Sequence, residues 1–424
     1  MAFRFIHTAD VHLDSPLRSL SFKDERIADL IGNATRRAFT RIVDLCLTER
    51  VDALMIAGDL YDGDLRSMKT AALIRREMAR LAEADIPVFV IRGNHDAAST
   101  VTPHLSLPKN VHVFGGRAGA IPVAGTGVVV HGISFAQPHI SESLVPKYKP
   151  PIADAVNVGL LHTSLAGSPD HDVYAPCGVS DLIDHGFDYW GLGHIHKRAV
   201  YGENGPATIV MPGMPQGRHI NEAGPKSVAI ATIEDDRSCV LEERPTGFAE
   251  FGRVSADVSG LADWTSIIRA LEASLGAASD AVEADHLVAR LEIKGASSLG
   301  FRLRRDADFL LHDLRAGFAE TGRCLIEAID LRLEAPEDRS GVSSGDPFFE
   351  LRALMAQDAA RSPAVRKAAR DLITTLQGQM PRELRDAFGD DDDALDALIE
   401  ELIADGTEAV VARFAAERDR TDAS

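Results

Sequence analysis

Short runs of apolar residues recur along the first half of the chain, and most of them end in polar residues. In one of them, Val51 to Ile56 leads through Ala57 and Gly58 into Asp59, as expected for a strand buried on both faces. Two stretches with helical spacing of apolar positions, at about 26–50 and 68–84, separate such runs. This alternation predicts a layered α/β domain.

Shorter strands with glycine turns follow from about residue 110 to 135, and further apolar runs lie near 158–162, 189–193, 208–213 and 227–233. These runs supply a second set of strands. We therefore expect two facing mixed sheets flanked by outer helices. Ligands should lie on loops at one rim, because open α/β sheets bind their ligands beyond the carboxyl ends of the strands.

The pattern changes after residue 247, where strands and helices alternate over a shorter stretch of chain. The expected strands there are 252–258, 287–294 and 325–333, and the expected helices are 264–275 and 306–320. We predict four segments, namely an α/β domain at 1–247, a small α+β capping domain at 248–335, a linker at 336–345 and a helical C-terminal region at 346–424.

Polar residues able to bind metals follow five of the expected strands, and they are Asp10 and His12, Asp59, the run Asn94-His95-Asp96, His162, and the pair His194 and His196. In extended backbone, residues i and i+2 point the same way, so each Asp-x-His or His-x-His pair can face one rim. Two-metal hydrolysis of a phosphodiester needs divalent ions roughly 3.5–4 Å apart. Asp59 is the candidate for the carboxylate that both ions share.

Taken singly, these residues have plainer explanations, since His162 could be a core histidine and Asp10 a strand-end cap. Their order along the chain favours a common site. Arg218 and His219 lie in a Pro/Gly loop soon after the last candidate ligands, where they could contact a substrate phosphate or simply form a tight turn.

The ordered motifs Asp-x-His, Gly-Asp, Gly-Asn-His-Asp, His and Gly-His-x-His resemble those of the calcineurin-like metallophosphoesterases. The resemblance implies a sandwich of two mixed sheets and a dinuclear metal centre. One ion would be bound by Asp10, His12, Asp59 and His196, and the other by Asp59, Asn94, His162 and His194. His95 would remain free of metal and protonate the leaving oxygen, oriented by Asp96.

Within that superfamily, the motifs around Asp10, Asp59 and Asn94 look most like the DNA-repair exonuclease branch, which contains the SbcD nuclease subunit and its relative YhaO. The stretch Pro212 to His219 looks nearer to YhaO. This branch implies a manganese-dependent DNA exonuclease or endonuclease that dimerises. It also implies a capping domain and C-terminal helices that dock on an SbcC-like coiled-coil ATPase.

Composition narrows these expectations. The formal net charge of −19 is unfavourable for strong DNA binding by this chain alone, because phosphate affinity comes mostly from Lys and Arg. No apolar run reaches 18 residues, so we expect no membrane span, and the polar residues near the N-terminus argue against a signal peptide. The four cysteines form no C-x-x-C pair, which fits a reducing cytoplasm.

Two other functions are compatible with the sequence. The same metal site would serve a small-molecule phosphodiesterase or phosphatase of the superfamily, although such an enzyme would not need the two additional segments. The chain could also be a non-catalytic DNA-repair interaction subunit with a vestigial site, against which the complete ligand set argues.

Overall fold

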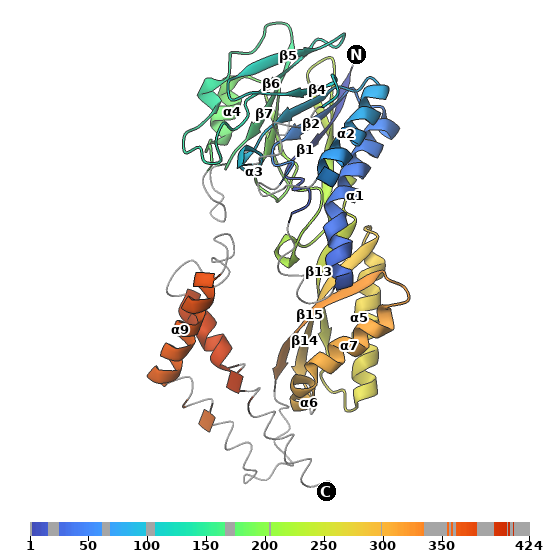
Figure 1. Ribbon diagram of the computed structural model, residues 1–424, viewed down its shortest axis with the longest axis vertical. Coiled ribbons are helices and arrows are strands. Elements are labelled where there is room, and N and C mark those ends of the chain that lie inside the picture. Colours follow the sequence, from blue (N-terminus) through green and yellow to red (C-terminus); the bar gives the residue numbers. More distant parts are fainter. Residues whose placement is uncertain are drawn as a thin grey trace. The chain divides into compact units, whose positions relative to one another are not determined.

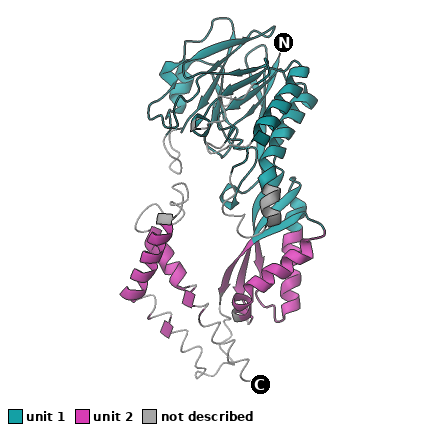
Figure 2. Cartoon of the chain, viewed as in Figure 1, with its two compact units in different colours: residues 1–253, 277–290, 321–327 teal, residues 254–276, 291–320, 328–424 magenta. Residues whose placement is uncertain are grey.

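The structure is a computed structural model. It describes residues 2–15, 25–61, 68–98, 107–165, 174–202, 205–297, 299–334, 362–379 and 394–404, with the short pieces 354–355, 358, 406–407 and 410. The chain divides into two compact units (Figure 2). The first contains Met1–Arg253, Ala277–Arg290 and Thr321–Glu327, and the second contains Val254–Gly276, Leu291–Glu320 and Ala328–Ser424.

The first unit is built on two six-stranded mixed sheets (Figure 1). The first sheet has the order β12 (Cys239–Pro245), β11 (Ser227–Ile233), β1 (Phe3–Thr8), β2 (Ala53–Ala57), β3 (Val88–Ile91) and β4 (Val111–Val113). Strands β1 to β4 are parallel, while β11 pairs antiparallel with β1 and β12. The carboxyl ends of β1, β2 and β3 therefore meet at one edge.

The second sheet has the order β5 (Gly119–Val123), β6 (Val128–Gly132), β7 (Val156–His162), β8 (Tyr189–Gly193), β10 (Thr208–Met211) and β9 (Ala199–Tyr201). Its inner four strands are parallel and its two edge strands are antiparallel. Residues of both sheets form one buried cluster, in which Phe5 and Met55 of the first sheet join Val158 and Leu160 of the second. The two sheets thus face each other, as the sequence predicts.

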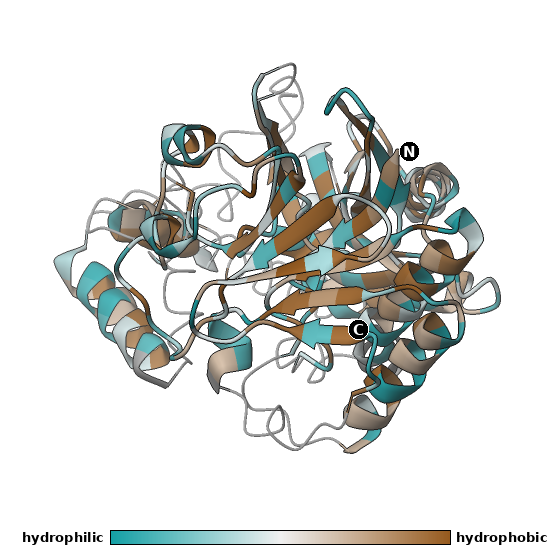
Figure 3. Ribbon diagram, turned by 90° about the horizontal axis from the view of Figure 1, so that it is seen from above, coloured by the Kyte–Doolittle hydropathy of each residue, from teal (hydrophilic) through white to brown (hydrophobic). Residues whose placement is uncertain are grey.

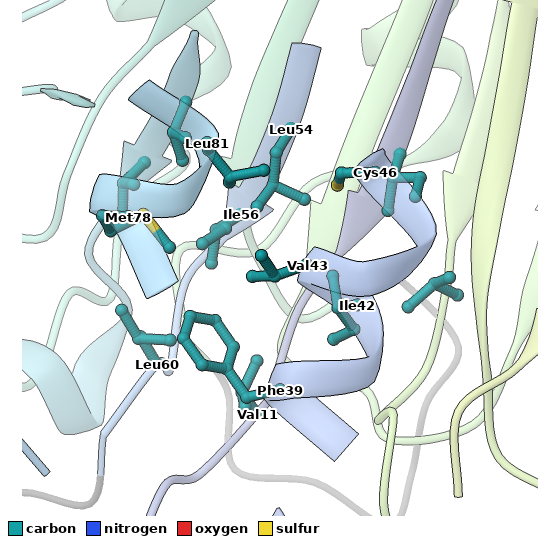
Figure 4. Packing of buried hydrophobic residues seen from close by; sticks show 14 of the residues in the cluster. Val11, Phe39, Ile42, Val43, Cys46, Leu54, Ile56, Leu60, Met78 and Leu81 are labelled. Atoms are coloured by element: carbon teal, nitrogen blue, oxygen red, sulfur yellow. The ribbon is translucent and has the colours of Figure 1, made fainter. Parts of the chain in front are cut away.

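Helices α1 (Glu25–Glu49) and α2 (Met68–Glu83) cover the outer face of the first sheet. Figure 4 shows Phe39, Ile42, Val43 and Cys46 of α1 and Met78 and Leu81 of α2 packed around Leu54 and Ile56 of β2. All five residues of β2 are buried because both of its faces are covered, which explains its uninterrupted apolar sequence. In Figure 3, many strands carry long hydrophobic stretches, whereas the helices alternate between hydrophobic and hydrophilic residues.

Helix α4 (Val179–His185) lies on the outer face of the second sheet, where Leu182 packs in one cluster with Trp190 of β8. Short helical segments occur at α3 (Asn94–Ala98), η2 (Val145–Lys147) and η3 (Ile220–Glu222). Helix α3 begins directly at a candidate ligand, and η3 lies in the Pro/Gly loop between β10 and β11.

A three-stranded sheet follows, in the order β13 (Ala249–Asp257), β14 (His286–Ala296) and β15 (Cys324–Glu334). The helices α5 (Trp264–Ala281), α6 (Gly300–Arg305) and α7 (Ala307–Phe318) alternate with these strands. The guanidinium of Arg302 lies 4.6 Å from the centre of the Trp264 ring. Each expected element is present, but the helix expected at 306–320 is preceded by α6, which the sequence pattern did not indicate.

Helix α9 (Pro363–Gln379) and a helix at 394–404 form a small hydrophobic cluster of Ile373, Ile399 and Ile403. Ion pairs from Arg366 to Glu400 and from Arg370 to Asp396 join the two helices. The expected linker at 336–345 lies outside the described residues. No helix within the described part of the chain is long and apolar enough to cross a membrane.

Candidate metal centre

The candidate ligands come from the carboxyl ends of strands in both sheets. Asp10 and His12 follow β1, Asp59 follows β2, and Asn94 follows β3. His162 is the last residue of β7, and His194 and His196 follow β8. All of these side chains except that of His196 are buried, and Asp10, His162 and Asp59 are at most 1% exposed. The fold therefore brings residues spread over nearly 190 positions of the sequence to one edge.

The backbone bends sharply where these ligands leave their strands. Asp10, His12, Asp59 and His194 have φ angles of 52°, 45°, 51° and 99°, in a region that residues other than glycine seldom adopt. Such a conformation costs roughly 1–2 kcal/mol for each residue. Hydrogen bonds hold it, because the Asp10 amide donates to Gly58 O and the His12 amide to Asp59 O, both at 3.0 Å.

The side chains form three overlapping groups, whose ligand atoms all lie within 4.8 Å of one another inside each group. The groups are Asp10 with His12 and His196, His12 with Asp59 and His95, and Asp59 with His162 and His194. Asp59 belongs to two of the groups, and that two ions share its carboxylate stays a prediction.

Individual distances show how closely the donor atoms converge. His12 Nε2 lies 3.2 Å from His196 Nε2, and His162 Nε2 lies 3.3 Å from Asp59 Oδ2 and 3.0 Å from Asn94 Oδ1. His162 Nδ1 donates a hydrogen bond to Ala57 O at 2.9 Å. In a neutral ring the lone pair is then on Nε2, the nitrogen that faces Asp59 and Asn94.

The chemistry of this donor set fits two divalent cations. Buried carboxylates at Asp10 and Asp59 are costly unless positive charge compensates them. Imidazole nitrogens together with carboxylate and amide oxygens are ligands of the first-row divalent metals. The residues predicted from the sequence are therefore suited to bind the ions that a dinuclear centre requires.

Histidine side chains partly compensate the negative charge of these buried carboxylates. Burial disfavours the ionised form of Asp59, but the charge and hydrogen bond of His162 outweigh it and hold the pKa of Asp59 below its ordinary value. Burial also opposes the charging of His162, yet Asp59 raises the pKa of that histidine to about 9. Burial raises the pKa of Asp10 to about 6 against the opposing charges of His162 and His196.

His95 lies beside the ligands and is only half-buried. Its backbone amide donates to Asp59 Oδ1 at 3.0 Å, and its ring meets that of His12 edge-on at a centroid distance of 4.9 Å. The two carboxylate oxygens of Asp96 accept the backbone amides of Tyr61 and Gly93, each at 3.0 Å. Asp96 thus braces the loops that carry Asp59 and Asn94, and its expected action on His95 stays a prediction.

Burial and the neighbouring Asp59 charge raise the pKa of Asp96 to about 7, against the two backbone hydrogen bonds. The two amides oppose this rise because they bind the ionised carboxylate more strongly than its protonated form.

The Pro/Gly loop brings Arg218 and His219 to the His196 side of the centre. Arg218 Nη2 lies 3.4 Å from His196 Nδ1, and Arg218 Nη1 donates to Ser15 Oγ at 3.3 Å. The side chain of Arg218 is 14% exposed and that of His219 is 42% exposed. The contact of Arg218 and His219 with a substrate phosphate stays a prediction.

One residue of the site, Glu222, was not expected from the sequence. Its carboxylate accepts hydrogen bonds from His196 Nδ1 at 3.0 Å and from Arg218 Nη2 at 2.7 Å. Burial opposes its ionisation, but Arg218 and His196 hold the pKa of Glu222 well below its usual range. Glu222 follows His196 by 26 residues and belongs to no motif, so the sequence carried no signal for it.

Two parts of the chain match known protein families. Residues 3–198 match the family model described as calcineurin-like phosphoesterase, and residues 251–334 match that of the middle domain of metallophosphoesterase YhaO. An uncharacterized metallophosphoesterase, YhaO of Bacillus subtilis, is 36% identical over 236 residues, which cover 54% of this chain and 57% of that protein.

The DNA double-strand break repair protein Mre11 of Sulfurisphaera tokodaii is 27% identical over 226 residues, covering 50% of this chain and 54% of that protein. This chain thus spans about half the length of the curated relatives it matches. Among solved structures, a dimetal phosphatase from Danio rerio is 14% identical with a TM-score of 0.37, covering 57% of this chain and 96% of that one.

Proposed function

Because this chain contains a calcineurin-like phosphoesterase domain followed by a YhaO-type middle domain, we propose that it is a two-metal phosphodiesterase that cleaves DNA during repair. One observation carries the proposal. Six of the seven candidate ligands form overlapping groups together with His95, and the buried carboxylate of Asp59 is common to two of the groups. The seventh, Asn94, has its Oδ1 atom 3.0 Å from His162 Nε2.

In this proposal, Asp10, His12, Asp59 and His196 bind one ion, and Asp59, Asn94, His162 and His194 bind the other. When bound, the two ions would neutralise phosphate charge and lower the pKa of a coordinated water. Manganese is our proposed metal, because the exonuclease branch that the sequence resembles uses it and the mixed nitrogen and oxygen donors suit it.

The protein groups around the ions have separate roles. His95 is half-buried beside His12 and Asp59, so its ring can reach a substrate while its backbone is anchored. We assign it the protonation of the leaving oxygen. His219 is the more accessible of the two loop residues and is assigned to substrate contact, whereas Arg218 contributes positive charge from a fixed position.

DNA is the proposed substrate because the sequence resembles the repair branch and because Mre11 relatives are described as DNA double-strand break repair proteins. The net charge of −19 means that this chain would hold long duplexes poorly by itself. We therefore propose that it acts as the nuclease subunit, and as a homodimer, with an SbcC-like coiled-coil ATPase.

The C-terminal helices are the proposed docking site for that ATPase. On α9, the side chains of Val365, Leu372 and Leu376 are 39%, 64% and 44% exposed. Their spacing of seven and four residues places them on one face of the helix, whereas Ile373 packs against the neighbouring helix. An exposed apolar face of this kind supports helix-to-helix docking.

The test is hydrolysis with added manganese of linear duplex DNA, single-stranded DNA and bis(p-nitrophenyl) phosphate. Asp59→Asn should abolish every activity. Asp154→Asn is a matched control, because Asp154 also has a positive φ, of 61°, but is exposed in a turn. Cleavage of DNA that disappears only in the Asp59 variant supports the nuclease assignment.

Cleavage of the small diester alone would favour the rival assignment, a phosphodiesterase or phosphatase for small molecules, unless a coiled-coil ATPase restores DNA cleavage. A wild-type chain that cleaves none of the three would favour a non-catalytic interaction subunit.

A further inference from the structure

The ring of His196 has a hydrogen-bonding partner on each side. Its Nε2 lies 3.2 Å from His12 Nε2, within the candidate metal group, and its Nδ1 lies 3.0 Å from Glu222 Oε1. An ionised carboxylate accepts but cannot donate, so Nδ1 must carry a proton in this contact. The same contact leaves the lone pair of the neutral ring on Nε2, which faces His12 and Asp10.

Glu222 is itself firmly held. Its side chain is 8% exposed, and Oε2 accepts the backbone amide of Arg218 at 2.7 Å and Arg218 Nε at 3.3 Å. Oε1 accepts from Arg218 Nη2 at 2.7 Å as well as from His196. Charge-assisted bonds of this kind are about twice as strong as neutral ones and fix the geometry of both partners.

The loop that carries Glu222 is also hydrogen-bonded to the segment Phe248 to Phe251. The buried side chain of Gln216 donates to Ala249 O at 2.7 Å and accepts from the Phe248 amide at 2.7 Å. The Gly224 amide donates to Phe251 O at 2.9 Å. Glu222 therefore approaches His196 from a segment tied to the first strand of the three-stranded sheet.

We propose that Glu222 is a positioning residue of the metal centre, which fixes the tautomer and the orientation of the His196 ring for the ion bound by Asp10, His12 and His196. The inference rests on the proposed function only in taking these residues as metal ligands. Carboxylates that hold metal-binding histidines in other proteins typically contribute 10–100-fold to metal affinity.

The decisive measurement is a calorimetric titration of the metal-free chain, residues 1–424, with Mn²⁺ alone, without substrate. For the wild type we expect two binding steps. Glu222→Gln should weaken one step about 10–100-fold and leave the other unchanged, because the candidate metal ligand that contacts this carboxylate is His196, which is assigned to one ion only. Glu222→Asp should lie between the two and provides a second variant if the first does not fold.

Glu77→Gln is the matched control. Glu77 is another buried glutamate, 1% exposed, which pairs with Arg76 and Arg80 of the same outer helix, α2. The substitution Glu77→Gln should lower the unfolding temperature without altering either Mn²⁺ binding step. Equal weakening of both steps in Glu222→Gln, or no change in either, would overturn the proposal and leave Glu222 a loop support.

The tautomer gives an independent readout that needs no metal. In ¹⁵N spectra of the metal-free protein, the His196 signals, identified by their loss in His196→Gln, should show a protonated Nδ1 in the wild type. In Glu222→Ala, which removes the oxygen that accepts from Nδ1, the two tautomers should mix. An unchanged tautomer refutes the positioning role, whereas a wild type that binds no Mn²⁺ refutes the proposed function instead.

Discussion

A single methyl group added at Gly93 should disrupt the metal centre more than its size suggests. A Cβ atom at this position would lie 2.2 Å from Asp59 Oδ1 and 2.8 Å from His162 Cε1. Ordinary contact between heavy atoms begins near 3.5 Å, so the carboxylate must move by about 1 Å. Neither neighbour can swing away freely, because Asp59 accepts the His95 amide and His162 donates to Ala57.

The displacement of Asp59 should lower both the stability of the fold and the affinity for Mn²⁺. Displacing Asp59 loses its hydrogen bond from the His95 amide, which should cost about 1.5–3 kcal/mol. For a unit of this size, about 2 kcal/mol lowers the unfolding temperature by roughly 4–8 °C. Because Asp59 belongs to two of the metal groups, both Mn²⁺ binding steps should weaken by at least 10–100-fold, in contrast to the single step expected for Glu222→Gln.

The assay combines differential scanning calorimetry, titration with Mn²⁺ and hydrolysis of bis(p-nitrophenyl) phosphate. Gly115→Ala is the control, because a Cβ atom there would meet nothing within 4 Å. If Gly93→Ala binds two ions and hydrolyses the diester like this control, then Asp59 does not occupy the shared position, and our reading of the centre is wrong.

Three other predictions test separate parts of the molecule. His95→Asn should keep both bound metals but lower kcat for the small diester about 10²–10⁴-fold, and full activity in that variant would remove the acid assignment. Burial lowers the pKa of His7 to about 3 in the folded chain, whereas histidine in the unfolded chain has a pKa near 6.5. Below pH 6.5 the unfolded chain therefore binds one proton more than the folded chain, and stability falls as the pH falls. Denaturant titrations measure how far the free energy of unfolding drops between pH 7 and pH 5. The drop should be about 2 kcal/mol smaller in His7→Gln than in the wild type, and equal drops would contradict this. Deletion of 346–424 should preserve hydrolysis of the small diester but abolish co-purification with a coiled-coil ATPase; retained co-purification would place the docking site elsewhere.

Much of the fold could be predicted because buried parallel strands leave a simple trace in the sequence. Strands such as β2 are apolar throughout, and a polar residue directly after them marks the edge where ligands gather. The ends of β1, β2, β3, β7 and β8 all follow this rule, and the polar side chains predicted there lie close together in the structure.

What the sequence missed depends on contacts between distant segments. Glu222 meets His196 only because the loop between β10 and β11 folds back over the end of β8. The sequence likewise did not indicate that the carboxylate of Asp96 accepts the backbone amides of Tyr61 and Gly93, because these contacts join the ends of two different strands.

The buried side chain of Gln216 bears on how such a protein can be divided or recombined. A gene fragment that stops at residue 247 keeps every metal ligand but discards the backbone groups of Phe248 and Ala249, to which this amide is bonded. An unpaired buried amide costs about 1–3 kcal/mol, and it would lie in the loop that reaches His196. A chimaera that joins a different three-stranded sheet to the first unit should therefore keep the native residues through Phe251, so that the exchange point falls after this residue rather than before Phe248.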